Sequence, residues 1–568
     1  MALNSTVVTL VCIPLLAMLA ARTYGLVVNY LQARKLGIPM VILPFSWHDD
    51  LWIIIYPWFR RLRDLPGIGH IFVFSYHSWA QDERYRPHQT YGDVFVIVAP
   101  TKNEIVVNDP VVAVELQTQY KSWIKPQPLY EIFESFGPNV ISINGEDWQR
   151  HRRIVNPAFR EQNNKLVWEE SLRQARQMIE AVTNRVDASR TMLDVRNDCV
   201  LIAMHVLSAA GFGHMHDFDG GLGEIPQGHK TSLAESLKFL LQNILFSVLF
   251  KNMPTLRFMM PALYRQLTAM TNEFTQYMKE VIAYNRAITQ GGGNSNGADI
   301  VSALVEADEA AKREQKTLAH GAGGKPMYLS DSELLGNLYI FNLAGFETTA
   351  NALTYTIPFL ATNREIQDWV GDEVDTVLKG RDAEKLDYEG VFPQLVRCLA
   401  LMYETLRLWG PVPSTERWCV GQPHAIRVNG QEIMVPVETY VSLNLYAVHS
   451  DPRWWGDDSL KWNPRRWIVA DPATGKESIA HPPPGAAFVP WSVGPRVCPG
   501  KKFSQVEFVA VISTLLREYR LKPLIMEGKM TTEEQASSAL LEVLEDSMNV
   551  ITPKMRRPED AGVVFVRR

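Results

Sequence analysis

Apolar residues recur every three to four positions along most of this chain, which is the spacing of one buried helix face. The pattern predicts helices over six long segments: 164–185, 232–250, 262–288, 330–360, 364–380 and 393–409. Apolar runs that favour β-strands are short and few: 93–100, 103–107, 432–437 and 562–568. Neither a repeat nor a strong linker divides residues 65–568. We therefore expect a mainly α fold with a minor β portion, built as one large domain.

The N-terminus has a different pattern, because no charged side chain precedes Arg22. This apolar stretch is close to the roughly 20 residues that a helix needs to cross a bilayer. Basic residues follow it at Arg22, Arg34 and Lys35, which places the bulk of the chain on the cytosolic side. Residues 1–35 are therefore predicted to form a transmembrane anchor with a basic flank. A cleaved signal peptide is the alternative, since LAMLAA resembles a cleavage site.

Residues 36–64 are predicted to link the anchor to the large domain. They include a second apolar run, LWIIIYPWF at 51–59, which is too short to span a bilayer. Its aromatic residues suit the headgroup region, so an interfacial or re-entrant element is one interpretation. A buried strand or helix of the globular part is an equally good one.

Composition and charge exclude some classes of function and of fold. Lysine and arginine number 57 against 62 acidic residues, giving a net charge of −5, so no nucleic-acid partner is expected. The chain has five cysteines and no CxxC pair, which argues against a disulfide framework. Four of these cysteines are expected to be packing residues: Cys12, Cys199, Cys398 and Cys419.

The fifth cysteine carries the chemistry. Residues 491–500 read WSVGPRVCPG and precede a predicted helix, so Cys498 lies where the helix dipole and free N–H groups favour a thiolate. Pro499 has no N–H, so the donors are expected to be Gly500 and Lys501. An isolated cysteine in a large domain is more often inert. An anionic sulfur on a glycine-framed loop is, however, what a thiolate-ligated haem iron requires.

This loop resembles the haem-binding loop of the cytochrome P450 family, Phe-x-x-Gly-x-Arg-x-Cys-x-Gly. The match is complete except that Trp491 stands in the aromatic position. Four further stretches agree in the family's order, so the resemblance covers residues 65–568. It implies the family's fold, a large helical domain with a smaller β-rich part, here preceded by the membrane anchor. It also implies haem b with Cys498 as the axial thiolate and metal ligand.

One of these stretches is YETLRLWGP at 403–411, which places Glu404 and Arg407 on one helix face. Such a pair is usually a solvated surface contact. In the family it meets an arginine from a later loop in a buried network, and WNPRRW at 462–467 makes Arg466 the third member. The resemblance implies a structural role for all three residues.

Another stretch is AGFETT at 344–349, in the middle of a long apolar helix. Glu347 and Thr348 are costly there unless they serve a purpose. Thr348 could simply bond the carbonyl one turn back. The sequence matches the family's acid–alcohol motif, which implies that both residues take part in proton delivery. Gly345, beside Ala344, is expected to remove side-chain bulk where a flat cofactor packs.

The remaining stretches concern the haem carboxylates. WQRHRR at 148–153 places Trp148 and Arg152 on one helical face, where both can reach a propionate. Arg417 follows Arg407 by ten residues, the family's position for another propionate-binding arginine. With Arg496 this makes three arginines for two carboxylates.

The resemblance implies a haem-thiolate monooxygenase that inserts one oxygen atom from O2 into a lipophilic small molecule, by hydroxylation or epoxidation. No dinucleotide or flavin fingerprint is visible, so NADPH is used indirectly, through NADPH–cytochrome P450 reductase. Lys501 and Lys502 are candidates for docking its acidic flavin domain. The chain is similar to filamentous-fungal members that tailor secondary metabolites. Such members are single-pass proteins of the endoplasmic reticulum membrane with a cytosolic catalytic domain.

Two alternatives stay open. A haem-thiolate isomerase or dehydratase would act on a peroxide without external electrons, and it is expected to lack the acid–alcohol pair. A non-catalytic haem-binding membrane protein would need neither a proton relay nor a reductase.

Overall fold

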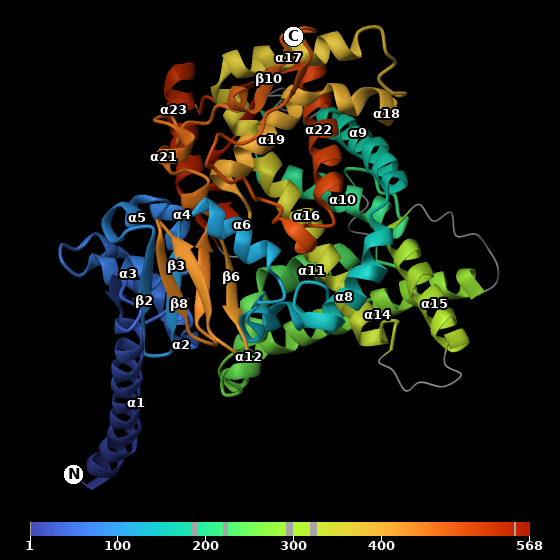
Figure 1. The fold of residues 1–568 in the computed structure, drawn as a ribbon. Coiled ribbons are helices and arrows are strands. Elements are labelled where there is room, and N and C mark those ends of the chain that lie inside the picture. The colour runs from blue at the N-terminus through green and yellow to red at the C-terminus, as the bar shows by residue number, and fades with distance from the viewer. Residues whose placement is uncertain are drawn as a thin grey trace.

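The computed structural model describes residues 2–183, 191–192, 194–219, 225–290, 299–318, 326–526, 528–549 and 552–568, without the side chains of 2–12, 15, 290 and 318. Helices dominate it (Figure 1). The longer ones are α1 (Ala2–Arg34), α2 (Asp50–Phe59), α6 (Pro110–Thr118), α8 (Gly145–Val155), α9 (Glu161–Thr183), α10 (Val195–Phe212), α11 (Leu233–Gln242), α12 (Ile244–Asn252), α14 (Pro261–Gln290), α15 (Ile300–Leu318), α16 (Asp331–Thr362), α17 (Arg364–Leu378), α19 (Val396–Trp409), α22 (Lys501–Glu518) and α23 (Glu533–Glu545).

Helix α16 is the centre of the helical part. It packs against α10, α19 and α22, and most of its residues are buried. Its start is fixed by a capping box, in which the Ser330 hydroxyl accepts from the Glu333 amide and the Glu333 side chain bonds the Ser330 amide. Such a helix can hold functional side chains at fixed positions deep inside the fold.

The main sheet lies at one side of the helices (Figure 1). Its strand order is β1-β2-β3-β9-β6-β4, with parallel pairs β1–β2 and β3–β9. The strands are β1 (Met40–Ile42), β2 (Val94–Val98), β3 (Asn103–Val107), β4 (Trp123–Ile124), β6 (Ser414–Cys419) and β9 (Tyr440–Asn444).

Four smaller sheets complete the β portion. A hairpin joins β7 (His424–Val428) to β8 (Gln431–Val435) through Asn429 and Gly430, both with positive φ, as a type I′ turn requires. The other sheets are β12-β15-β5, β13-β14 and β10-β11. Their strands are β5 (Thr191–Met192), β10 (Ile468–Ala470), β11 (Glu477–Ile479), β12 (Tyr519–Pro523), β13 (Ser547–Asn549), β14 (Pro553–Met555) and β15 (Val563–Arg567).

The mainly α fold with a minor β portion is confirmed, and the long predicted helices end within a few residues of the observed ones. The prediction of one helix over 232–250 is wrong, because the chain bends by 60° between α11 and α12 at Asn243. There the Asn243 side chain donates to the carbonyl of Phe239 at 2.9 Å. Strand β1, inside the segment predicted as a linker, pairs with β2 in the main sheet.

Helix α1 projects from the sheet side of the molecule, and its C-terminal part is fixed to the sheet (Figure 1). The side-chain amide of Asn29 donates to the Ala99 backbone carbonyl at 2.7 Å, and the side-chain amide of Asn103 donates to the Asn29 backbone carbonyl at 2.9 Å. A Cβ at Gly25 would lie 2.4 Å from the Pro100 carbonyl oxygen, so only glycine permits this approach. The last three turns of α1 therefore belong to the globular part.

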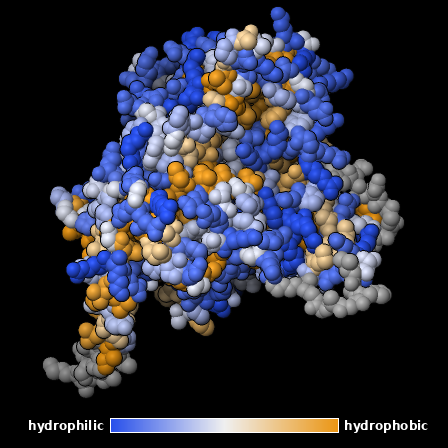
Figure 2. Space-filling model, in the orientation of Figure 1, coloured by the Kyte–Doolittle hydropathy of each residue, from blue (hydrophilic) through white to orange (hydrophobic). Residues whose placement is uncertain are grey.

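The projecting part of α1 exposes apolar side chains, including Ile13, Leu16 and Leu19 (Figure 2). In the described part of the chain, no single helix has the length and apolarity to cross a membrane, whereas the bent pair α11–α12 meets that test by length and composition only. The side chains of residues 1–12 and 15, which supply much of the predicted anchor, lie outside the described residues.

Helix α2 contains the second apolar run. Trp52 and Tyr56 are buried, with the Trp52 ring stacked on Phe45 at 4.2 Å and the Tyr56 ring on Tyr76 at 4.5 Å. Trp58 is 78% exposed on the other face. One face of α2 thus belongs to the globular fold, and whether the other meets a bilayer stays a prediction.

Candidate active site

Cys498 lies in a loop that leads directly into α22. Its amide donates to the Trp491 carbonyl at 2.8 Å, which closes the loop. Gly494 has φ +71°, and a Cβ there would lie 3.0 Å from a methyl of Thr118, so both the turn and the packing require glycine. The loop therefore presents the cysteine at the N-terminus of a long buried helix.

The surroundings of the sulfur combine access with a positive potential. Cys498 is exposed to solvent. The protein atoms around its sulfur nevertheless desolvate the thiol, and this desolvation raises the pKa of the thiol. The Gly500 amide and the charges of Arg152 and Lys501 act in the opposite direction. The Lys501 amide, expected as a second donor to sulfur, donates to the Cys498 carbonyl instead. A thiolate that ligates a metal is stabilised in such a setting.

The middle of α16 is an open stretch in the interior of this largely buried helix. Ala344, Gly345, Glu347 and Thr348 are partly exposed, whereas the residues on either side are buried. The Thr348 hydroxyl donates to the Ala344 carbonyl at 2.8 Å, the bond that a helical threonine forms by default. A Cβ at Gly345 would lie 3.1 Å from both methyls of Leu207. Gly345 thus makes room for α10, and that it also makes room for a flat cofactor stays a prediction.

Glu347 is held by residues that the sequence did not associate with it. Arg196 donates to its carboxylate at 3.1 Å and Thr552 at 3.0 Å, while the Lys554 amine lies 3.6 Å away. The Arg196 and Lys554 side chains are 31% and 27% exposed, against 13% for Glu347. The carboxylate therefore connects partly solvated cations to the interior of α16.

Glu404, Arg407 and Arg466 form one buried network, so the structure brings together all three predicted members. Arg407 makes a bidentate pair with the Glu404 carboxylate at 2.8 and 2.9 Å, and Arg466 donates to it at 3.1 Å. Trp467 and the Asn463 amide satisfy the same carboxylate at 2.9 Å each. Arg407 also donates to the carbonyls of His449 and Ser459. This dense bonding is what keeps a buried charged group tolerable.

The predicted propionate-binding residues fall into two places. Arg496 stacks over the Trp148 ring at 4.4 Å and donates to the Ile143 carbonyl and to Asn144. Arg417 is close enough for its charge to lower the pKa of Arg496, second to burial. Arg152 lies apart from this pair and donates to the Val497 carbonyl at 2.8 Å, beside the cysteine.

Lys125 and Tyr130 join Arg417 and Arg496, although neither belongs to a motif that sequence reasoning could recognise. The Lys125 amine lies 4.7 Å above the Tyr130 ring and donates to the Ile141 carbonyl. Burial and the charges of Arg496 and Arg417 lower the pKa of Lys125 well below its ordinary value. Burial raises the pKa of Tyr130 to about 12.

The cationic cluster of Arg417, Arg496 and Lys125 is a suitable site for an anionic ligand. The Arg496 Nη1 atom is buried without a hydrogen-bond partner, although a buried guanidinium normally satisfies every donor. An anionic ligand would satisfy this donor and compensate the three mutually repelling cations. The residues present therefore fit a group that offers carboxylates to the cluster and a metal to the Cys498 sulfur.

Comparison with known proteins identifies the family. The family model of cytochrome P450 matches residues 61–548. The chain belongs to this family. Membership implies a haem held by a cysteine thiolate, in agreement with the donor set around Cys498. Like its named relatives, this cytochrome P450 is a monooxygenase and an oxidoreductase.

Three fungal relatives illustrate the similarity. A cytochrome P450 monooxygenase of Arthrobotrys oligospora is 27% identical over 93% of each chain. The phomenoic acid biosynthesis cluster monooxygenase of Leptosphaeria maculans is 28% identical over 98% of this chain and 96% of its own. The monooxygenase ORF6 of Penicillium roqueforti is 30% identical, covering 86% of this chain and 87% of its own.

The fold agrees with a solved crystal structure of a cytochrome P450, CYP102L1. The TM-score is 0.63 at 20% sequence identity, covering 85% of this chain and 93% of that one. The predicted family fold, with its large helical domain and smaller β-rich part, is thereby confirmed. The roles of the individual site residues remain predictions that rest on their geometry.

Proposed function

We propose that this cytochrome P450 inserts one oxygen atom from O2 into a lipophilic small molecule of secondary metabolism, with two electrons supplied by NADPH through a separate reductase. The other oxygen atom leaves as water after taking up two protons. When bound, haem b would supply the oxygen activation and insertion. The observation that carries the proposal is the presence, in one fold, of Cys498 at the N-terminus of α22 and of an open stretch in the middle of the central helix.

The chain's own contribution begins with holding the cofactor. Cys498 would supply the thiolate sulfur, while Arg417, Arg496 and Lys125 would hold the haem carboxylates, with the Trp148 ring supporting Arg496. Arg152 donates to the loop carbonyl of Val497 and adds positive potential at the sulfur.

Proton delivery is proposed for Glu347 and Thr348. Protons would pass from the partly exposed Arg196 and Lys554 region to the Glu347 carboxylate and then to the Thr348 hydroxyl. Thr348 can hold and pass a proton only when its hydroxyl turns away from the Ala344 carbonyl. The buried residues on either side of this stretch would limit the access of bulk water.

A Thr348→Ala variant is expected to consume NADPH at a similar rate while releasing more hydrogen peroxide and less product. The reason is that oxygen is still reduced but its second protonation is misdirected. The ratio of product to NADPH consumed measures this coupling. Thr354→Ala is the matched control, because Thr354 makes the same backbone bond to Ala350 in the same helix. Unchanged coupling in the Thr348 variant would remove the assignment.

An Arg196→Met variant is expected to slow product formation by about tenfold, because Glu347 loses its closest cation. The solvent deuterium isotope effect on turnover is expected to rise, a change that a purely structural role would not produce. Arg173→Met is a suitable control, since Arg173 pairs with Glu170 away from α16. An isotope effect equal to that of the parent protein would rule out the proposed relay.

The membrane and reductase assignments are also proposals. The apolar N-terminus and the exposed residues of α1 support a single-pass anchor in the endoplasmic reticulum membrane, with the catalytic domain in the cytosol. Lys501 and Lys502 are exposed beside the cysteine loop and lie over the rings of Trp491 and Phe392. Both ammonium groups are therefore available to an acidic flavin domain.

The deciding experiment expresses the full chain with a reductase and compares the metabolites of strains with and without the gene. NADPH-dependent formation of an oxygenated product is expected. The biosynthesis cluster that names the Leptosphaeria relative supports a search among secondary metabolites. Turnover of a hydroperoxide with no need for NADPH would contradict the proposal and favour the isomerase or dehydratase.

A further inference from the structure

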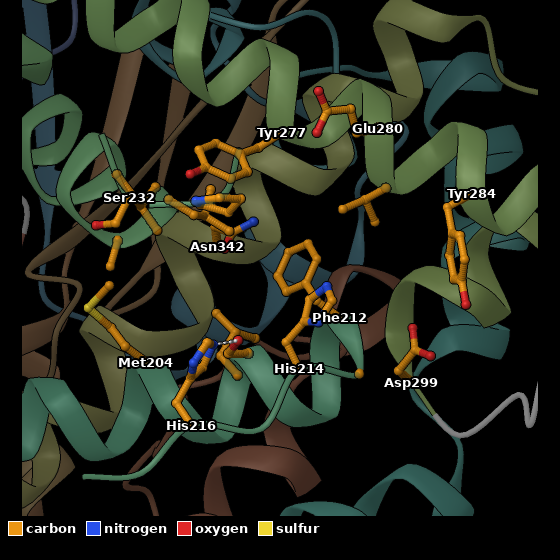
Figure 3. A pocket seen from close by; sticks show the side chains of 18 of the residues that line it. Met204, Phe212, His214, His216, Ser232, Tyr277, Glu280, Tyr284, Asp299 and Asn342 are labelled. Carbon is orange, nitrogen blue, oxygen red and sulfur yellow. Dashed lines mark hydrogen bonds between the residues drawn. The ribbon is translucent and has the colours of Figure 1, made fainter. Parts of the chain in front are cut away.

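A cavity of about 820 Å³ lies between α10, α11, α14 and α16 (Figure 3). Helix α16 contributes Asn342 and Phe346, which are four residues apart and share one face. Ala344 and Thr348 are two positions further along, about 200° round the helix. None of the predicted haem-site residues lines the cavity. It is therefore a separate space behind the active-site helix, and we call it the back cavity.

The floor of the back cavity is apolar. It is formed by Met204 and Leu207 of α10, Leu237 of α11 and Phe346 of α16. The volume suits a small organic molecule, and the floor would bury its hydrocarbon part. Leu207 also contacts Gly345, so the floor lies directly against the open stretch of α16.

The polar lining of the cavity includes two carboxylates. Asn342 is 3% exposed, one of its side-chain N–H groups donates to the Leu338 carbonyl at 2.9 Å, and no hydrogen bond from a described residue reaches its amide oxygen. Glu280, Asp299 and Tyr284 lie on the side of the cavity away from Met204 (Figure 3). None of the described residues that line the cavity is a lysine or an arginine.

The acidic groups already bond their neighbours, but no cation other than histidine faces them in the cavity. Glu280 accepts from Gln276 and from His229, and Asp299 accepts from Ser302 at the start of α15. Carboxylates beside exposed aromatic rings are the chemistry that recognises organic cations, since the ring face and the carboxylate both attract positive charge.

From this arrangement we propose that the back cavity binds a lipophilic cation with N–H donors, such as an amine or a guanidine. Its hydrocarbon part lies on the Met204, Leu207 and Phe346 floor. Its cationic end lies among Glu280, Asp299 and Tyr284. The site is independent of the haem pocket, because α16 separates the two.

The test uses the full-length holoprotein with its haem pocket filled by saturating 4-phenylimidazole. Calorimetric titration with 4-phenylbutylguanidinium, which is permanently charged and a poor iron ligand, is expected to show one site per chain. The neutral isostere 4-phenylbutylurea is expected to bind about fivefold or more weakly. Loss of guanidinium binding when 4-phenylimidazole is present would place the probe in the haem pocket and overturn the proposal, as would the absence of saturable binding.

Variants locate the site. Combined Glu280→Gln and Asp299→Asn substitutions are expected to remove the preference for the guanidinium, and asparagine can still cap α15. Glu314→Gln, an exposed position of α15 outside the cavity, is the matched control. Ala234→Trp from α11 or Val281→Trp from α14 fills the cavity and is expected to abolish binding of both probes, with haem absorption confirming that the protein is folded. A preference that survives the double substitution, or binding that survives both tryptophan variants, would refute the site.

Discussion

A Cys498→Ser protein is expected to have no monooxygenase activity and to lose the absorption signature of a thiolate-ligated haem. A serine oxygen at this position is a weaker ligand that does not donate electron density as a thiolate does. The loop geometry can persist, because the bond between the residue 498 amide and the Trp491 carbonyl does not involve the side chain. The absorption spectrum of the ferrous–CO complex and NADPH-dependent turnover together measure the effect.

Cys419→Ser is the control for this experiment. Cys419 is buried, and its sulfur makes only long contacts of 3.5 Å with the carbonyls of Val435 and Pro436. Its replacement is expected to leave the spectrum and the activity unchanged. If the Cys498 variant kept the parent spectrum, the metal-ligand assignment and the proposed function would both fail.

A Glu404→Ala variant is expected to lower the free energy of unfolding by about 3–5 kcal/mol, because Arg407 is left charged, fully buried and without its carboxylate. Arg466 and the Trp467 N–H lose the same acceptor. Urea unfolding of the holoprotein, followed by far-ultraviolet circular dichroism and by haem absorption, measures the loss.

Two further variants serve as comparisons. Glu404→Gln keeps an acceptor oxygen for only one of Asn463 and Trp467, which bond different carboxylate oxygens, and it removes the negative charge, so most of the loss is expected to remain. Glu432→Ala breaks an exposed pair with Arg427, whose side chain is 79% exposed, and is expected to change stability little. A Glu404→Ala protein as stable as the Glu432→Ala protein would contradict the buried-network interpretation.

The sequence predicted the long helices well because their periodicity extends over many turns. The segment 262–288 corresponds to α14 (Pro261–Gln290), and 330–360 to α16. Short elements carry too few residues to show a period, so β1 and β4 were missed. The bend at Asn243 was missed because apolar spacing continues through it.

For the site, the sequence predicted residues within motifs and missed those that arrive from elsewhere in the chain. Cys498 and the Glu404 network are marked by local patterns. Arg196 and Lys554 reach Glu347 from positions 151 residues before it and 207 after it, and no spacing rule connects them. Lys125 joins Arg496 in the same way, through tertiary packing alone. The contact of Gly345 with Leu207 of α10 was also missed, since periodicity does not tell which helix packs on a glycine.

The attachment of α1 to the main sheet bears on how a truncated protein should be designed. Residues Gly25, Asn29 and Ala33 pack on the β2–β3 turn or in the core beside it, and the Arg22 guanidinium pairs with Asp49 at 2.6 Å. A chain cut after Arg34 would therefore uncover an apolar edge of the sheet and favour self-association in detergent-free buffer. A cut placed before Arg22 removes the exposed apolar end of α1 but keeps the contacts between α1 and the main sheet. It is therefore the better starting point for crystallisation.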